Sequence, residues 1–311
     1  MDIRTFSFRL FWLFLVVLSL FSFIQAQSKN NALTKDIELR ASLWTKDDGF
    51  LKQLTSNDLE IFSDNKKLAI LSAEPNDDPI TVGILIDMSG SFHEGDKRYS
   101  AILNGLEKFL QLSNPENRYF ILGFAEEQKL LLDTTSDKNA VTSALKKLSD
   151  ERSKNETATW DAIKSGIEKL SNGANSRKAI LVLSDGEENV SKTDFNDIKK
   201  IVQLSGIQVF QILPQLKDPG YMSSEILKGL AFSEEISTSS SGMIFFPEST
   251  LETETAFQKV ADELRSQYLI KARIIVDSDE PDWHKLKWKV SPDIKKKFGK
   301  ITITAPNDIF L

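Results

Sequence analysis

The chain has 311 residues and a formal net charge of −6, with no cysteine and only two histidines. The acidic balance argues against a general binder of nucleic acid or of anionic membranes. The lack of cysteine excludes thiol catalysis, disulfides and thiolate zinc sites, and His93 and His284 cannot form a His-Glu-x-x-His zinc motif. The length suits one α/β domain of roughly 180 residues together with a smaller module.

The first 26 residues have the layout of a secretory signal peptide. Arg4 and Arg9 give a positive start, Leu10–Ile24 is almost entirely apolar, and Ala26 offers a small residue for cleavage. The apolar run is short for a transmembrane helix. We therefore expect an exported protein, periplasmic, cell-surface or secreted, which contacts a membrane only if this segment stays uncleaved.

Residues 36–79 are predicted to form an N-terminal β segment. Asp36–Trp44 alternates between apolar and polar residues, which is typical of a half-buried strand. Two further segments, 59–62 and 68–71, flank Ser63–Lys66 and predict a hairpin turn. Pro75–Pro79 is a linker by composition.

From Ile80 to Gln267 the pattern changes to strands and helices in alternation, which predicts a mainly parallel sheet covered on both faces. A Ser-rich loop is expected at Ser237–Gly242. The predicted strands are 80–86, 118–125, 129–134, 178–184, 207–213 and 243–246. The predicted helices are 97–112, 137–148, 159–170, a helix capped by Thr193 that runs to Leu204, 223–232 and 251–267.

Residues 268–311 return to alternation without helices, with strands expected at 268–276, 286–290 and 301–304. Neither this C-terminal β segment nor residues 36–79 can bury a core alone. The expected fold class is therefore α/β, a doubly wound, mainly parallel sheet over residues 80–267, with a small β-sandwich formed by the flanking N- and C-terminal segments.

Three short segments place oxygen-bearing side chains after predicted strands or before a predicted helix. Asp87, Ser89 and Ser91 follow the apolar run 81–86, Thr157 precedes a helix, and Asp185 follows the predicted strand 178–184. Ligand sites of open α/β sheets gather at the carboxyl ends of strands. Oxygen ligands suit a hard cation such as Mg²⁺.

Together these segments resemble the metal ion-dependent adhesion site of the von Willebrand factor type A domain. That family has Asp-x-Ser-x-Ser, a later Thr and a later Asp-Gly, and the pattern maps onto Asp87, Ser89, Ser91, Thr157 and Asp185. Where the family usually has Gly-Gly before the Thr, this chain has Asn155-Glu156. Leu54–Asn65 is similar to the leader that precedes the type A domain in a bacterial group of secreted, type A-related proteins.

The resemblance implies that Ser89, Ser91 and Thr157 contact Mg²⁺ or Mn²⁺ directly, whereas Asp87 and Asp185 act through bound water. One coordination position then stays open for a carboxylate of a protein partner. We therefore expect a metal-dependent, adhesion-type binding module, without enzymatic activity, nucleic-acid binding or a small-molecule substrate.

Two other functions stay open at this stage. One is an architectural subunit of a cell-envelope assembly, in which the metal site is vestigial, and the other is a hydrolase that uses the metal to activate water. Glu187 and Glu188, which follow Asp185-Gly186, are either a second cation site or a solvated acidic turn.

Overall fold

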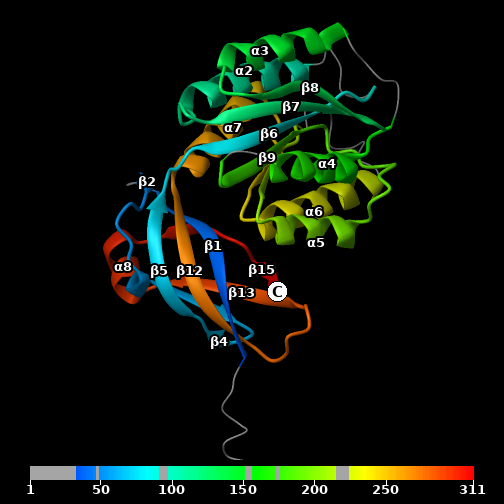
Figure 1. Ribbon diagram of the computed structural model, residues 1–311. Coiled ribbons are helices and arrows are strands. Elements are labelled where there is room, and N and C mark those ends of the chain that lie inside the picture. Colours follow the sequence, from blue (N-terminus) through cyan, green and yellow to red (C-terminus); the bar gives the residue numbers. More distant parts are fainter. Residues whose placement is uncertain (1–32, 47–48, 91–96, 151–155, 173–174, 215–223) are drawn as a thin grey trace, which may run out of the picture.

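A computed structural model describes residues 33–46, 49–90, 97–150, 156–172, 175–214 and 224–311. The chain folds into two parts, which Figure 1 shows one above the other. The α/β module consists of the elements from β6 to α7, and the β module is built from the segments before and after it. The predicted signal peptide, Ser91 and Asn155 lie outside the described residues.

The α/β module is built on a six-stranded sheet of order β11-β10-β9-β6-β7-β8. All neighbours pair in parallel except β7 and β8, which are antiparallel. The central strand β6 is buried at every position, because helices cover both faces of the sheet. The strands of this sheet are β6 (Ile80–Asp87), β7 (Arg118–Phe124), β8 (Gln128–Thr135), β9 (Arg177–Leu183), β10 (Gln208–Ile212) and β11 (Ile244–Phe245).

Two hydrophobic clusters lie on opposite faces of this sheet. Side chains of α2, α3 and α7 pack on one face, and those of α4, α5 and α6 pack on the other. This doubly wound arrangement confirms the predicted fold class. The helices are α2 (Lys97–Leu112), α3 (Lys138–Lys146), α4 (Thr159–Ser171), α5 (Phe195–Ser205), α6 (Ser224–Ser239) and α7 (Thr250–Arg265), with a 3-10 turn η2 (Lys147–Asp150) after α3.

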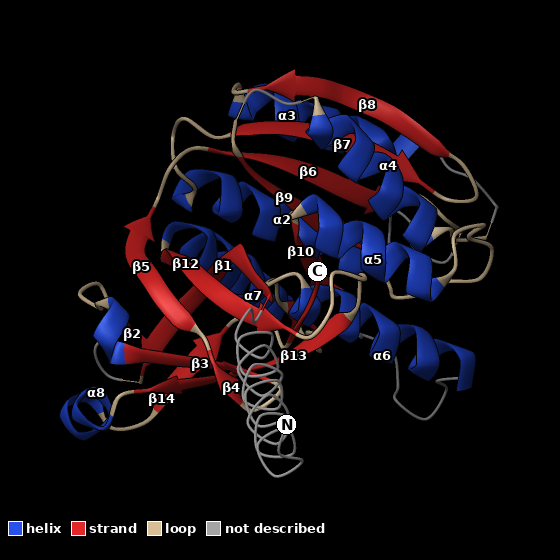
Figure 2. Ribbon diagram, turned by 60° about the horizontal axis from the view of Figure 1, so that its bottom comes forward, coloured by secondary structure: helices blue, strands red, loops and turns tan. Residues whose placement is uncertain are grey.

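Segments far apart in the sequence form the two sheets of the β module (Figures 1 and 2). One sheet has the order β14-β1-β12-β5, with β2 beside β1, and the other has the order β15-β13-β3-β4. The apolar sides of both sheets share one core. The strands are β1 (Leu33–Thr45), β2 (Gly49–Phe50), β3 (Leu59–Ser63), β4 (Lys66–Lys67), β5 (Ala69–Asn76), β12 (Gln267–Val276), β13 (Trp283–Val290), β14 (Ile301–Thr304) and β15 (Asp308–Phe310), with a 3-10 turn η1 (Ser56–Asp58) before β3.

Three local expectations about helices were wrong. The expected loop at Ser237–Gly242 begins as the last turn of α6, because Ser237 and Ser239 are buried and the Gln211 side chain donates to Ser237 Oγ at 3.1 Å. The C-terminal segment contains a helix, α8 (Pro292–Phe298), capped by Ser291. The cap of α5 is Asp194, one residue after the expected Thr193.

Two expectations about strands also need correction. The expected linker at Pro75–Pro79 begins within β5, whose last residues pair with Tyr268 and Gln267 of β12. The strand β15 was missed, because it is only three residues long and is defined by its pairing with β13. Among the described helices, none is both long and apolar enough to span a membrane.

Buried polar contacts join the two modules. Glu263 of α7 is 2% exposed, and its carboxylate accepts hydrogen bonds from Ser42 Oγ at 2.6 Å and from Trp44 Nε1 at 3.0 Å. On the other side of the junction, Lys199 of α5 forms an ion pair with Asp308 of β15 at 2.7 Å. The modules are therefore tied at two separate points.

A fragment of residues 27–79 should not fold alone, because β1 and β5 pair with β12 and β3 pairs with β13. A fragment of residues 80–267 should unfold cooperatively, since it retains the whole six-stranded sheet. Urea titration followed by circular dichroism tests both expectations. A cooperative transition in the 27–79 fragment would contradict the first, and the division at 79/80 and 267/268 stays a prediction until then.

Candidate metal centre

The candidate residues lie in loops at the carboxyl ends of the parallel strands. β6 and β9 are parallel neighbours, with Ile86 paired to Leu183, so Asp87 and Ser184 emerge side by side at the carboxyl ends of their strands. Ser89 follows β6, and Asp185 follows Ser184. Asp87 and Ser89 are each 2% exposed and Asp185 is 7% exposed, so this edge is well covered.

The Asp87 carboxylate holds the two loops together. Its Oδ1 accepts a hydrogen bond from the backbone N–H of Ser89 at 2.8 Å, and its Oδ2 accepts one from Ser184 Oγ at 2.6 Å. The same Ser184 Oγ accepts from the backbone N–H of Gly186 at 3.1 Å. Ser184 therefore links the Asp-x-Ser loop to the Asp-Gly loop. The sequence analysis missed this role, although Ser184 stands directly before Asp185-Gly186 at a strand end.

Thr157 lies in a third loop that is bound to the same edge. Its backbone N–H donates to Asn189 Oδ1 at 2.9 Å, and its carbonyl oxygen accepts from the backbone N–H of Asn189 at 3.0 Å. The next residue, Ala158, donates its N–H to the carbonyl of Ala125, just after β7. The Thr159 hydroxyl donates to the carbonyl oxygen of Glu187 at 3.1 Å, a structural contact that leaves Thr157 as the better candidate. Sequence analysis did not single out Asn189.

The structure thus brings Asp87, Ser89 and Asp185 together and places the Thr157 loop against the segment that follows Asp185. Ser91 lies outside the described residues, so its position stays a prediction.

The backbone conformation at position 186 favours glycine. Its φ is +89°, a region that side-chain-bearing residues rarely adopt. A Cβ there would also lie 2.5 Å from Cδ2 of Leu230. The turn therefore requires glycine at position 186, whether or not a metal binds.

The electrostatics of the edge favour a cation. Burial, together with the nearby charge of Asp185, raises the pKa of Asp87 to about 7, although the hydrogen bonds from Ser184 and Ser89 oppose this rise. Two buried carboxylates of like charge repel each other, and a bound dication removes that cost. The described residues contain no group of three or more His, Cys, Asp or Glu side chains placed to hold a metal, so an ion here needs the hydroxyls of Ser89 and Thr157 as well. Two carboxylates and several hydroxyls fit Mg²⁺ or Mn²⁺.

Glu188 has a local structural role. Its carboxylate accepts hydrogen bonds from the backbone N–H of Trp160 at 3.0 Å, in the first turn of α4, and from the backbone N–H of Ser191 at 3.1 Å. Ser191 Oγ also donates to it at 2.9 Å. Burial raises the pKa of Glu188, and these donors oppose the rise. The contacts account for Glu188 without a second cation.

Residues 82–188 match the family model of the von Willebrand factor type A domain. The chain contains a type A domain. The matched segment runs from β6 to the loop after β9 and includes all five candidate metal ligands. The resemblance found in the sequence is thereby confirmed for this part of the chain.

Solved structures with a similar fold include the conserved hypothetical protein BatB from Bacteroides thetaiotaomicron, which is 19% identical with a TM-score of 0.48 over 60% of this chain and 100% of that chain. A von Willebrand factor type A protein from Catenulispora acidiphila is 10% identical, with a TM-score of 0.49 over 91% of this chain and 74% of that one. The pilus adhesin SpaC from Lactobacillus rhamnosus GG is 14% identical, with a TM-score of 0.47 over 65% of this chain and 35% of that one.

A search of curated proteins finds no match to the chain. The structural likenesses are too distant to carry an argument about function. The metal centre is therefore judged on its own residues.

Proposed function

We propose that the type A domain is a metal-dependent protein-binding module. Ser89, Ser91 and Thr157 would hold Mg²⁺ or Mn²⁺, with Asp87 and Asp185 behind them. The observation that supports this most strongly is the pair of buried carboxylates, Asp87 and Asp185, which lie close together at the carboxyl ends of β6 and β9.

The donor set indicates what such a module would bind. Hydroxyl ligands are neutral, so they leave the positive charge of the ion largely uncompensated, and Mg²⁺ keeps exchangeable positions in sites of this kind. A carboxylate is the protein group that best satisfies such an ion. The expected partner is therefore a protein that presents an acidic side chain, and the proposed role is adhesion or assembly, with no catalytic step.

The place of action follows from the sequence. An N-terminal segment with the layout of a signal peptide favours export, so we place the binding function in the periplasm, at the cell surface or outside the cell. This assignment predicts that the mature protein begins near residue 27, which N-terminal sequencing of the exported protein tests.

Capture of a partner should require the metal and the hydroxyl of Ser89. The wild-type protein, Ser89→Ala and a control, Ser72→Ala in β5 of the β module, are immobilised and exposed to envelope extract in Mg²⁺ or in chelator. We expect capture by the wild type and by Ser72→Ala in Mg²⁺ only, and loss of capture by Ser89→Ala. The loss should occur without unfolding, because Ser89 lies in a loop beyond β6.

Elution of the captured protein by free acetate would support ligation through a carboxylate. Undiminished capture in chelator would instead favour the architectural alternative, in which the metal site is vestigial.

A further inference from the structure

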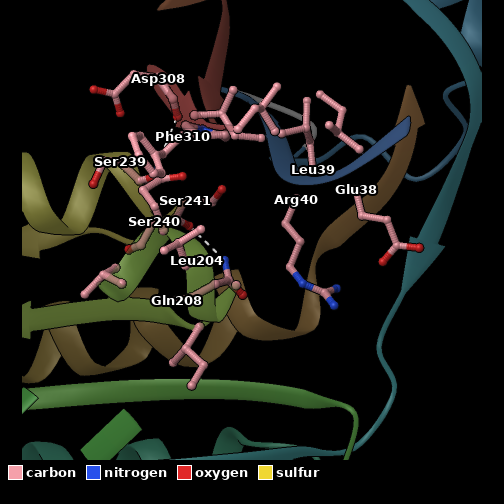
Figure 3. Close-up of a pocket in the computed structure, with 18 of the residues that line it drawn as sticks. Glu38, Leu39, Arg40, Leu204, Gln208, Ser239, Ser240, Ser241, Asp308 and Phe310 are labelled. Carbon is pink, nitrogen blue, oxygen red and sulfur yellow. Dashed lines mark hydrogen bonds between the residues drawn. The ribbon is translucent and has the colours of Figure 1, made fainter. Parts of the chain in front are cut away.

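A cleft of about 360 Å³ lies between the two modules, a size typical of small-ligand sites. Strand β1 forms one wall, and the end of α5, the start of β10 and the turn after α6 form the other. Figure 3 shows Arg40 extending from β1 on the opposite side of the cleft from Leu204, Gln208 and Ser241. Because Gln208 is the first residue of β10, the cleft lies at the amino-terminal ends of the parallel strands. The candidate metal centre lies at their carboxyl ends, on the opposite side of the module.

The cleft offers apolar surface from both modules. Leu204, at the end of α5, is 69% exposed, which is high for a large apolar side chain. Leu269 of β12 and Phe310 of β15 also line the cleft and are half-buried. An apolar ligand group placed here would remove these side chains from water.

The two acidic side chains that line the cleft each contact a lysine. Glu38 forms an ion pair with Lys271 at 3.6 Å, and Asp308 forms one with Lys199 at 2.7 Å. Lys199 also pairs with Glu235 at 2.7 Å, so these ion pairs offset the negative charge of the two groups only in part.

Arg40 differs, because no ion pair within the described part of the chain includes it. Its guanidinium donates to Asn76 Oδ1 over a long 3.4 Å. Burial lowers the pKa of Arg40, and this effect outweighs the attraction of Glu38 and Asp78, which oppose it. A half-buried guanidinium without a contacting carboxylate favours an anionic ligand, which it can bind through two parallel hydrogen bonds.

A second arginine adds to the positive charge near Arg40. Arg177 is 2% exposed and donates to the backbone carbonyls of Asp78 and Leu264 at 2.6 and 2.7 Å. Burial lowers its pKa to about 10, and the charge of Arg40 contributes to that change. The charges of Asp77 and Asp78 oppose this lowering of the pKa of Arg177. Within the described residues, neither carboxylate forms an ion pair with Arg40 or Arg177, and Asp77 pairs with Arg265 instead.

We propose that this cleft binds an amphipathic carboxylate, with the carboxylate group on Arg40 and the apolar body against Leu204 and Leu269. A free aliphatic acid and the C-terminal end of a peptide share this chemistry. The site is separate from the metal centre and from the partner binding proposed there.

The test is calorimetric titration of the mature chain in chelator, so that no carboxylate can bind through a metal ion. The probes are octanoate and N-acetyl-leucyl-leucine, each compared with its neutral amide. We expect at least one acid to bind, with its amide about tenfold weaker or more. Binding by octanoate alone identifies a free acid, and binding by the dipeptide identifies a peptide end.

Arg40→Gln should weaken binding of the acid by about tenfold or more. Arg273→Gln is the matched control, because Arg273 lies on the same sheet, is exposed and is already paired with Asp36 at 2.6 Å. Leu204→Ser should also weaken binding. Because Leu204 is exposed, this variant should fold normally and keeps the test valid even if Arg40→Gln unfolds.

Three results would overturn the proposal. They are no binding of either acid at about 10 mM, equal affinity for acid and amide, and wild-type affinity in both Arg40→Gln and Leu204→Ser.

Discussion

Replacing Asp87 by Asn should lower the affinity of the protein for Mn²⁺ by about 10- to 100-fold, the usual effect of removing a group that supports metal ligands. The Asn side chain retains an oxygen for the Ser89 N–H and keeps the shape that fits beside Ser184, but it removes the negative charge. Calorimetric titration of each protein with Mn²⁺ measures the change in affinity.

The metal-free variant supplies a second readout. Without metal, Asp87→Asn should be at least as stable as the wild type, because the repulsion between Asp87 and Asp185 is gone. Wild-type protein at about 100 times its Kd for Mn²⁺ should gain roughly 2.7 kcal/mol of stability. The control is Asp133→Asn, an exposed carboxylate on β8 that pairs with Lys169. Equal Mn²⁺ binding by Asp87→Asn and wild type would refute the metal assignment.

Glu263→Gln should remove most of the pH dependence of stability that arises at the junction of the modules. Burial raises the pKa of Glu263 from 4.5 to about 7, despite the hydrogen bonds from Ser42 and Trp44. The folded state therefore binds the proton more tightly than the unfolded chain. The stabilising effect is complete below pH 4.5 and is lost as the pH rises through about 7.

The expected size of this loss is about 3 kcal/mol between pH 4.5 and pH 8. Because Gln is neutral at both pH values and can still accept hydrogen bonds, Glu263→Gln should be more stable than the wild type at pH 8 and similar to it near pH 4.5. Urea denaturation at the two pH values measures this, with Glu254→Gln on the same helix as the control. If the wild type and Glu263→Gln lose stability in parallel between the two pH values, the junction carboxylate is not responsible.

The sequence was sufficient for the fold class because the main signals are local. The run Ile80–Ile86 is apolar except for Thr81, as expected for a strand buried on both faces, and helices such as α2 show clear apolar periodicity. Helix α8 was missed although Ser291 followed by Pro292 is a recognised start signal, because strand alternation on both sides dominated the interpretation.

The remaining errors come from contacts that are distant in sequence. The end of α6 is helical where Ser residues predicted a loop, because those residues pack against Gln211 of β10. Asn189 binds the Thr157 loop across 32 residues, and Glu263 meets Ser42 across 221 residues. No local pattern reveals such pairs. The candidate ligands could be named from the motif, whereas Ser184 and Asn189, which hold the loops in place, could not.

The pairing of Asn76 with Gln267 has a mechanical consequence. β5 leads into the α/β module and β12 leaves it, and these two strands are hydrogen-bonded neighbours in one sheet. A pulling force applied at the candidate metal centre would therefore reach the β module through two covalent connections side by side. The force pulls β5 and β12 in the same direction, so it does not separate these two strands from each other. It acts instead as shear between β12 and its other neighbour, β1. A connection of this design resists tension better than a single tether.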